Sequence, residues 1–287
     1  MTSPSDRSQG TPFDAAQGRP FDVAQGAPVR LGAVGYLNAR PLTWALDQSP
    51  QPWHIRYDVP SVCSALLYAG EVGLGLIPSV DYLQSPDYRI VPGVGIGSRG
   101  AIASVALFTR VPLDDVKRIA LDTSSRTSVA LVRVLCHHRF RIAAEFVPHG
   151  PDLEAMTHGS DAALLIGDPA LEARHEALGL KKIDLGAEWT AMTGLPFVYA
   201  AWTGRAGAIT DAGVGRLQKA QEEGVRSFDD IAAEYGRGNP DATTRAAAYL
   251  RDNVKYGLGL EEARGLQAFL DYAADLNLAP RRTLEFF

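Results

Sequence analysis

Segments typical of strands alternate with segments typical of helices along most of this chain, and that alternation restricts the possible folds more than any other feature. Apolar runs at 29–35, 72–77 and 116–122 have the length of buried strands. Helix-like sequence follows at 38–47 and 129–138. Repeated strand–helix units favour a mainly parallel sheet with helices on its faces. We therefore predict an α/β protein.

The order of these units predicts two lobes. A self-contained α/β block at 111–200 interrupts a first lobe that would contain 29–110 and 201–287. The chain would then cross between the lobes near Arg110 and Ala201. A length of 287 residues is sufficient for two such lobes. Two crossings would leave a cleft between the lobes, where small-molecule sites are common. A single doubly wound domain with a helical tail is the alternative.

The first 28 residues are predicted to form a disordered or loosely docked tail. They contain two similar seven-residue segments, 12–18 and 20–26, surrounded by Ser, Gly, Gln and Pro. Two short copies are too few for a repeat fold, and the low apolar content offers little to offset chain entropy. The tail lacks the apolar core of a secretory signal, and no run in the chain is long and apolar enough to span a bilayer. We expect a cytoplasmic protein that does not act at a membrane.

Composition excludes several classes of function. A net charge of −5 gives no general attraction to nucleic acid, so an anionic ligand would need a local site. Cys63 and Cys136 are far apart, and the six histidines lack metal-ligand spacing, so no metal site is predicted. The G-x-G-x-x-G segment at 95–100 precedes a strand-like run instead of a helix, which argues against dinucleotide binding. No nucleophile motif of a hydrolase is present.

The strongest local signal is the segment at 121–128, Leu-Asp-Thr-Ser-Ser-Arg-Thr-Ser, where a predicted strand runs into a predicted helix. The start of a helix presents free backbone N–H groups to an anion, while hydroxyls and a guanidinium add donors. The alternative is an ordinary helix cap, for which one hydroxyl suffices. The density of hydroxyls favours an anion cradle, with these predicted ligand-binding residues: Thr123, Ser124, Ser125, Arg126, Thr127 and Ser128.

Other polar residues follow predicted strands and are expected to reach the same cleft. Asn38 lies just after the first strand, where open α/β sheets place their ligands, although it could instead cap the next helix. Ser79 follows the run at 72–77, and Gly167 with Asp168 follows a β-like run at 162–167. Each of these could also serve only as a turn residue.

Six segments together resemble the chorismate dehydratase family, whose members carry out the first step of the futalosine route to menaquinone. The resemblance spans most of the chain after the tail. It implies a fold like the type II periplasmic solute-binding proteins, with two mixed sheets flanked by helices, no cofactor, and a substrate held between the lobes. The segments are Val34–Leu42, Ile77–Leu83, Leu121–Val129, Gly167–Leu171, Asp184–Thr190 and Gly194–Ala200.

The same resemblance implies a lyase that removes water from chorismate, a dicarboxylate, to give 3-[(1-carboxyvinyl)oxy]benzoate. The family's Asn corresponds to Asn38, which would hydrogen-bond the leaving hydroxyl. A family Ser corresponds to Ser104, near the enolpyruvyl group. The motifs contain no His or Lys base, so the ring proton would pass to a substrate carboxylate or to Asp168. Alternatives are a non-catalytic binder of small anions and the sister naphthoate synthase of the same pathway, although the segment at 37–41 fits the dehydratase better.

Overall fold

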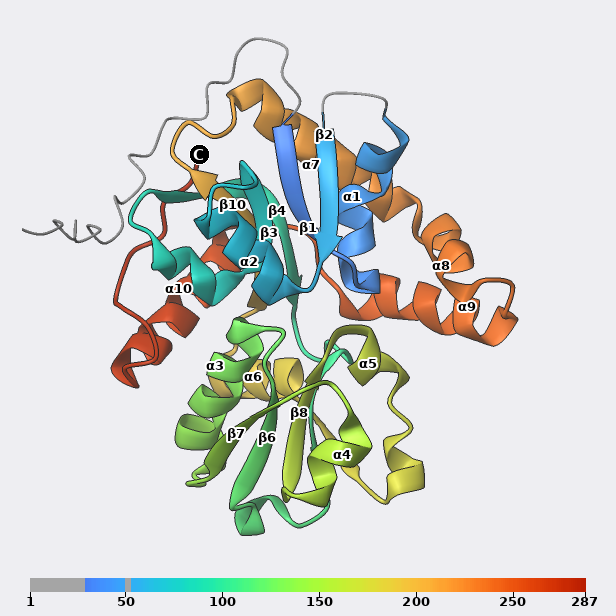
Figure 1. The fold of residues 1–287 in the computed structure, drawn as a ribbon, viewed down its shortest axis with the longest axis vertical. Helices are drawn as coiled ribbons and strands as arrows, with labels where there is room; N and C mark the ends of the chain where they lie inside the picture. The colour runs from blue at the N-terminus through green and yellow to red at the C-terminus, as the bar shows by residue number, and fades with distance from the viewer. Residues whose placement is uncertain (1–28, 50–52) are drawn as a thin grey trace, which may run out of the picture.

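Two five-stranded sheets, each flanked by helices, form two lobes that meet at a narrow waist (Figure 1). The computed structural model describes residues 29–49 and 53–287, and the predicted tail at 1–28 lies outside the described residues. The α/β class and the pair of mixed sheets predicted from the sequence are confirmed.

Four of the five strands in the first sheet run in one direction, and the fifth, β10, runs antiparallel to its two neighbours. Strand β10 pairs antiparallel with both β3 and β4. All five residues of β3 are buried, as expected for a central strand covered on both faces. In sheet order the strands are β2 (Trp53–Asp58), β1 (Val29–Val34), β3 (Leu74–Pro78), β10 (Phe197–Arg205) and β4 (Tyr88–Ser98).

The second sheet repeats this plan. Strand β6 is parallel to both β7 and β8, while β5 is antiparallel to β8 and to β9. Its order is β7 (Glu145–His149), β6 (Arg118–Asp122), β8 (Ala162–Ile166), β5 (Val105–Thr109) and β9 (Lys181–Asp184).

Helices cover both sheets, and several also link the lobes. Helix α2 packs on β1 and β3, α7 packs on α1 and β4, and α10 contacts both β10 of the first lobe and α3 of the second. The helices are α1 (Arg40–Gln48), α2 (Pro60–Tyr68), α3 (Arg126–Leu135), α4 (Leu153–His158), α5 (Gly167–Glu172), α6 (Leu185–Thr193), α7 (Asp211–Arg226), α8 (Phe228–Gly236), α9 (Pro240–Ala248) and α10 (Leu260–Asp275). Short 3-10 helices include η1 (Leu37–Ala39) and η2 (Ser79–Gln84), and a π-helical turn, η6 (Tyr249–Asn253), follows α9.

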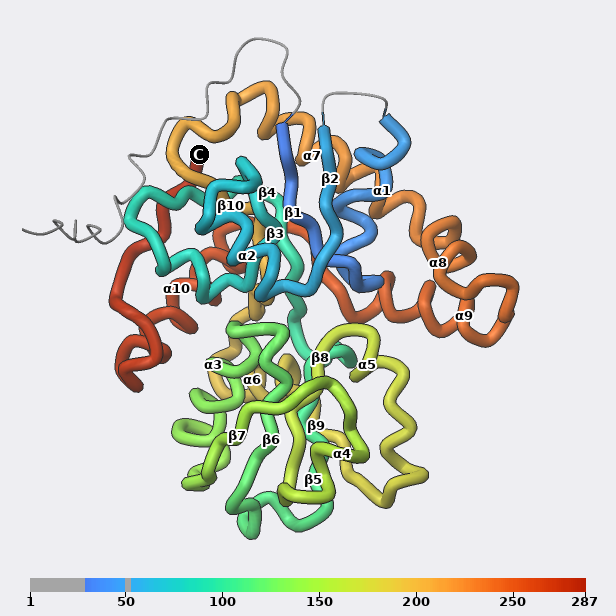
Figure 2. The backbone as a smooth tube through the Cα atoms, viewed as in Figure 1, coloured from blue at the N-terminus to red at the C-terminus, as the bar shows by residue number. Residues whose placement is uncertain are grey.

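The chain crosses between the sheets earlier than the sequence predicts. Strand β5 belongs to the second sheet, so the first crossing lies at 99–104 and not near Arg110. Strand β10 belongs to the first sheet from Phe197 onward, so the second crossing precedes Ala201. Apolar content identifies a strand but not the sheet that it joins. The two connections pass beside each other at the waist, where the Gly100 N–H donates to Thr190 Oγ1 at 2.9 Å (Figure 2).

The glycine-rich segment at 95–100 begins inside β4 and is not followed by a helix. A Cβ atom on Gly97 would lie 2.7 Å from the carbonyl oxygen of Phe197 on the neighbouring strand. Gly97 therefore allows β4 and β10 to approach closely and does not form a phosphate-binding turn.

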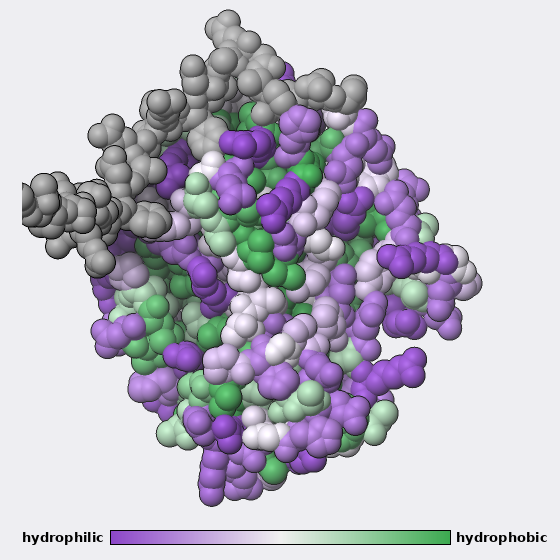
Figure 3. Space-filling view, viewed as in Figure 1, coloured by the Kyte–Doolittle hydropathy of each residue, from purple (hydrophilic) through white to green (hydrophobic). Residues whose placement is uncertain are grey.

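The carboxyl ends of parallel strands from both sheets face the waist. The segments after β1 and β3 of the first lobe meet the segments after β8 and β6 of the second, as the bonds from Leu37 N–H to Asp168 Oδ1 at 3.0 Å and from Val80 N–H to Thr127 Oγ1 at 3.1 Å show. Polar side chains cover most of both lobes on the face in Figure 3, and residues of intermediate hydropathy lie across the waist. Ligands of open α/β sheets bind at such strand ends, so this is where a site is expected.

Candidate active site between the lobes

A small cavity of about 40 Å³ lies between the lobes. Five of the six segments that carry the family resemblance contribute to its wall, and none of the described residues that line it carries a charge. The volume is sufficient for one or a few water molecules, so the lobes are closed on each other in this structure. The lining consists of Val34, Tyr36, Asn38, Pro60, Pro78, Ile96, Val105, Ser125, Ser128, Ile166, Gly167, Tyr199 and Ala200.

The start of α3 places two hydroxyls at this cavity. Ser125 is the N-cap residue, and its Oγ accepts from the Ser128 N–H at 3.4 Å and lies 3.1 Å from Ser128 Oγ. The capping role that we considered as an alternative is therefore present. It does not exclude an anion, because the first turn of a helix has further N–H groups without partners inside the helix.

Two other residues predicted to bind the ligand form a seam between the lobes. Thr127 is fully buried, and its Oγ1 accepts from the Val80 N–H at 3.1 Å and lies 3.3 Å from Ser79 Oγ. Ser79 in turn donates to the Val198 carbonyl at 2.7 Å. Neither Ser79 nor Thr127 lines the cavity. Ser124 also joins the lobes, since its carbonyl accepts from the Ser61 N–H.

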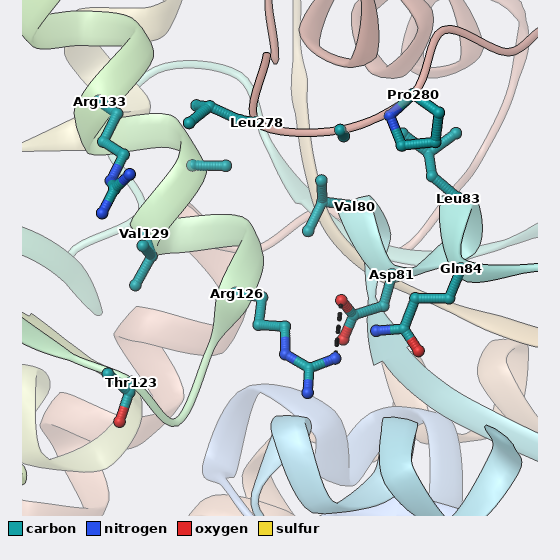
Figure 4. Close-up of a pocket in the computed structure, with 12 residues that line it drawn as sticks. Val80, Asp81, Leu83, Gln84, Thr123, Arg126, Val129, Arg133, Leu278 and Pro280 are labelled. Atoms are coloured by element: carbon teal, nitrogen blue, oxygen red, sulfur yellow. Dashed lines mark hydrogen bonds and ion pairs between the residues drawn. The ribbon is translucent and has the colours of Figure 1, made fainter. Parts of the chain in front are cut away.

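Thr123 and Arg126 line a different pocket on the flank of the molecule (Figure 4). This pocket, of about 530 Å³, lies between α3, η2 and the segment at 278–280. In it the Arg126 guanidinium contacts the carboxylate of Asp81 at 3.3 Å. Asp81 is buried, and that desolvation raises the pKa of its carboxyl group, while Arg126 opposes the rise. The residues that were predicted to form one anion cradle therefore lie in three places: the cavity, the seam between the lobes and the flank pocket.

Asn38 and Ser104 both lie beside Tyr249, a residue that belongs to no recognisable motif. The Tyr249 hydroxyl donates to Ser104 Oγ at 2.7 Å. The Asn38 side chain lies beside the same hydroxyl, where its hydrogen bonding acts to lower the pKa of Tyr249. Asn38 Oδ1 is buried and has no hydrogen-bond partner among the described residues. Asn38 lines the cavity, and Ser104 precedes Val105, which lines it as well.

A short strained segment of the first crossing holds Ser104 in place. Ala103 has a φ of 65°, a left-handed conformation that costs about 1 kcal/mol or more for a residue other than glycine. The Asp184 carboxylate accepts from the N–H groups of Ile102 and Ala103, at 3.1 and 2.6 Å, and Lys182 donates to the Ala103 carbonyl at 2.6 Å. Asp184 is therefore a positioning residue, and its place in a resemblance segment could have suggested this.

Gly167 and Asp168 close the second lobe against the first. Gly167 has a φ of 66°, and a Cβ atom there would lie 2.7 Å from the ring of Tyr36. Asp168 Oδ1 accepts from the Leu37 N–H at 3.0 Å, and its side chain lines an outer groove instead of the cavity. Burial raises the pKa of Asp168 to about 6, although the bond from Leu37 opposes the rise.

The raised pKa of Asp168 predicts that this residue makes the closed protein less stable above pH 6. The folded protein retains a proton that the unfolded chain has already lost, so stability falls as pH rises from about 4 to about 6. Asp168→Asn removes this dependence. Between pH 4 and pH 7, the free energy of unfolding of Asp168→Asn should rise relative to that of the parent protein by on the order of 2 kcal/mol. This figure is reduced because the Asp168 side chain is partly exposed to solvent. Urea unfolding at several pH values measures the difference, and two parallel curves would contradict it.

Two lobes of mixed sheet with a cavity between their strand ends define a protein of the periplasmic-binding-protein fold class. The Escherichia coli periplasmic aliphatic sulphonate binding protein SsuA superposes with a TM-score of 0.62 at 18% identity, covering 89% of each chain. Protein AF1704 of Archaeoglobus fulgidus gives a TM-score of 0.63 at 18% identity, covering 88% of this chain and 98% of that one.

Sequence comparison assigns the chain to a family within that class. A family model described as menaquinone biosynthesis matches residues 29–275. The chorismate dehydratase of Thermus thermophilus is 31% identical over 273 residues, covering 87% of this chain and 96% of that protein. The chain belongs to the menaquinone biosynthesis family. Among the residues that the structure describes, no helix is long and apolar enough to cross a membrane.

Proposed function

We propose that this protein is a cytoplasmic lyase that removes water from chorismate to give 3-[(1-carboxyvinyl)oxy]benzoate. The observation that carries the proposal is the meeting at one cavity of four residues from three separate resemblance segments: Asn38, Ser125, Ser128 and Gly167. The identity with the Thermus thermophilus chorismate dehydratase supports the same reaction. This elimination moves no electrons to an acceptor, so it requires no redox cofactor.

The reaction removes one ring proton and the ring hydroxyl group, and formation of an aromatic ring drives it. Asn38 Oδ1 is a buried acceptor without a partner among the described residues, suited to orient the hydroxyl that leaves. Ser104 accepts from Tyr249, so its own O–H is available as a donor. In this proposal Ser104 lies near the enolpyruvyl group.

The ring proton passes to a carboxylate. Asp168, with a pKa raised to about 6, has a suitable basicity near neutral pH. Its side chain lies in the outer groove, bonded to the Leu37 N–H, and so must turn inward to reach the substrate. A carboxylate of the substrate itself is the other acceptor, and it needs no such movement. If Asp168→Asn kept the kcat of the parent protein, the acceptor of the ring proton would be the carboxylate of the substrate.

Substrate entry requires the lobes to separate. The cavity is far smaller than chorismate, and ligand pockets typically have several hundred Å³. The seam formed by Ser79 and Thr127 and the Leu37–Asp168 bond would open together. Reclosure around the substrate would hold the ring for elimination and exclude water.

Incubation of the purified protein with chorismate tests the function. Appearance of an aromatic enolpyruvyl benzoate, detected by ultraviolet absorbance and mass spectrometry, is the expected result. Tight binding of chorismate without turnover would instead identify a non-catalytic anion binder. Absence of both would contradict the proposal, and a naphthoate synthase would then be the activity to assay.

Some of the predicted hydroxyls line the cavity and others line the flank pocket, and this difference allows a direct test of where the substrate binds. Ser128→Ala removes a hydroxyl at the cavity and is expected to raise the dissociation constant for chorismate about tenfold, which is the contribution of one hydrogen bond to a charged group. Thr123→Ala alters the flank pocket and serves as the matched control, with affinity unchanged. Isothermal titration with the Asn38→Ala background, in which turnover is slow, measures both. An equal loss in the two variants would contradict the cavity as the binding site.

A further inference from the structure

We propose that Tyr249 is a positioning residue that orients Asn38 and Ser104 as one hydrogen-bonded unit. This inference rests on the proposed dehydratase function and goes beyond it by assigning a residue outside the resemblance segments. Tyr249 is the first residue of the turn η6, it is 3% exposed, and it lies 145 positions from Ser104 in the chain.

The direction of each hydrogen bond follows from the donors available. The Tyr249 hydroxyl has one proton, which it donates to Ser104 Oγ at 2.7 Å. The Asn38 side chain can therefore bond to Tyr249 only by donating from its amide nitrogen. That choice turns Asn38 Oδ1 away from Tyr249, and this oxygen is the buried atom without a partner among the described residues.

The same chain of bonds determines what Ser104 can do. Because Ser104 Oγ accepts from Tyr249, its own proton is free for a substrate oxygen. Hydrogen bonds in a buried series polarise one another, so donation from Tyr249 strengthens Ser104 as a donor. Burial raises the pKa of Tyr249 well above its ordinary value, so the hydroxyl keeps the proton on which this arrangement depends. Without Tyr249, the Asn38 amide can rotate and Ser104 can turn its proton elsewhere.

Tyr249→Phe tests the role, with Tyr256→Phe as the matched control. Tyr256 is similarly buried, but its hydroxyl has no hydrogen-bond partner among the described residues. We expect Tyr249→Phe to lower kcat about tenfold, or about 1.4 kcal/mol, with KM changed less than about twofold. Tyr256→Phe should keep both constants. A purely structural role would change stability, measured by thermal unfolding, without this separation of kcat from KM.

A double-mutant cycle with Ser104→Ala completes the test. If Tyr249 acts through its partners, Tyr249→Phe should lower kcat less than about threefold in the Ser104→Ala background. A full tenfold loss there, or a Tyr249→Phe enzyme with normal kcat, would overturn the inference. Should Tyr249→Phe fail to fold, 4-aminophenylalanine at this position provides a second test. It keeps an N–H donor toward Ser104 and should retain most of kcat. If this variant folded but were inactive, the inference would also be overturned. A wild-type protein that does not dehydrate chorismate would contradict the proposed function instead.

Discussion

Asn38→Ala is expected to lower kcat for chorismate dehydration at least about 100-fold while leaving the fold intact. The substitution removes a buried amide oxygen that has no hydrogen-bond partner among the described residues and belongs to a side chain that lines the cavity. Loss of a single oriented polar group at a reacting centre typically costs two to three orders of magnitude in rate. Steady-state kinetics give kcat, and thermal unfolding confirms that the variant is folded.

Asn38→Asp provides the isosteric comparison. It keeps an oxygen at the cavity but replaces the amide nitrogen that donates to Tyr249 by an acceptor. We expect a comparable loss of kcat, because the Tyr249 hydroxyl must then turn from Ser104 toward the new carboxylate. Full activity in either folded variant would exclude Asn38 from the leaving-group role.

Gly167→Ala is expected to prevent closure of the lobes and to lower kcat/KM about 100-fold. The backbone of Gly167 is left-handed, and a Cβ atom would lie 2.7 Å from the Tyr36 ring, closer than two such atoms can approach. The lobes must then stay apart or Tyr36 must move out of the cavity wall. Small-angle scattering with and without chorismate measures closure, and kinetics measure its consequence.

Gly179→Ala separates the effect of the clash from that of backbone strain. Gly179 has a nearly identical φ of 65°, but no atom lies within 4 Å of the position that its Cβ would take. This variant should lose about 1 kcal/mol of stability and keep its activity. Equal losses of activity at both glycines would show that strain and not contact across the cleft is responsible.

Much of the fold could be predicted because it depends on local patterns. The strand–helix units before Ser79 and from 116 to 138 follow directly from apolar runs and turn residues, and their order indicated two lobes. Strand β9 lacks such a signal because its residues are mostly polar, and strand β2 has no continuous apolar run because its apolar and polar residues alternate. The crossing points were misplaced for a related reason, since the apolar run before Arg110 is compatible with either sheet.

The candidate site could be predicted in part. Asn38, Ser125, Ser128 and Gly167 follow strand ends and do line the cavity. Tyr249 could not be found in this way, because its contact with Ser104 joins positions far apart in a chain and depends on how η6 packs against the first crossing. Asp184 had a place in a resemblance segment, but its support of the Ala103 backbone becomes visible only in three dimensions.

The amino-acid sequence by itself determined that this chain forms strand–helix units and that a hydroxyl-rich turn follows the strand at 116–122, because both properties arise from residues close together in the chain. Only the tertiary structure decided which of those hydroxyls line the cavity between the lobes. Residues 123–128 occupy one turn of backbone, yet successive side chains on a helix start point in different directions. Ser125 and Ser128 therefore face the cavity, Thr127 joins the lobes, and Arg126 turns outward to the carboxylate of Asp81.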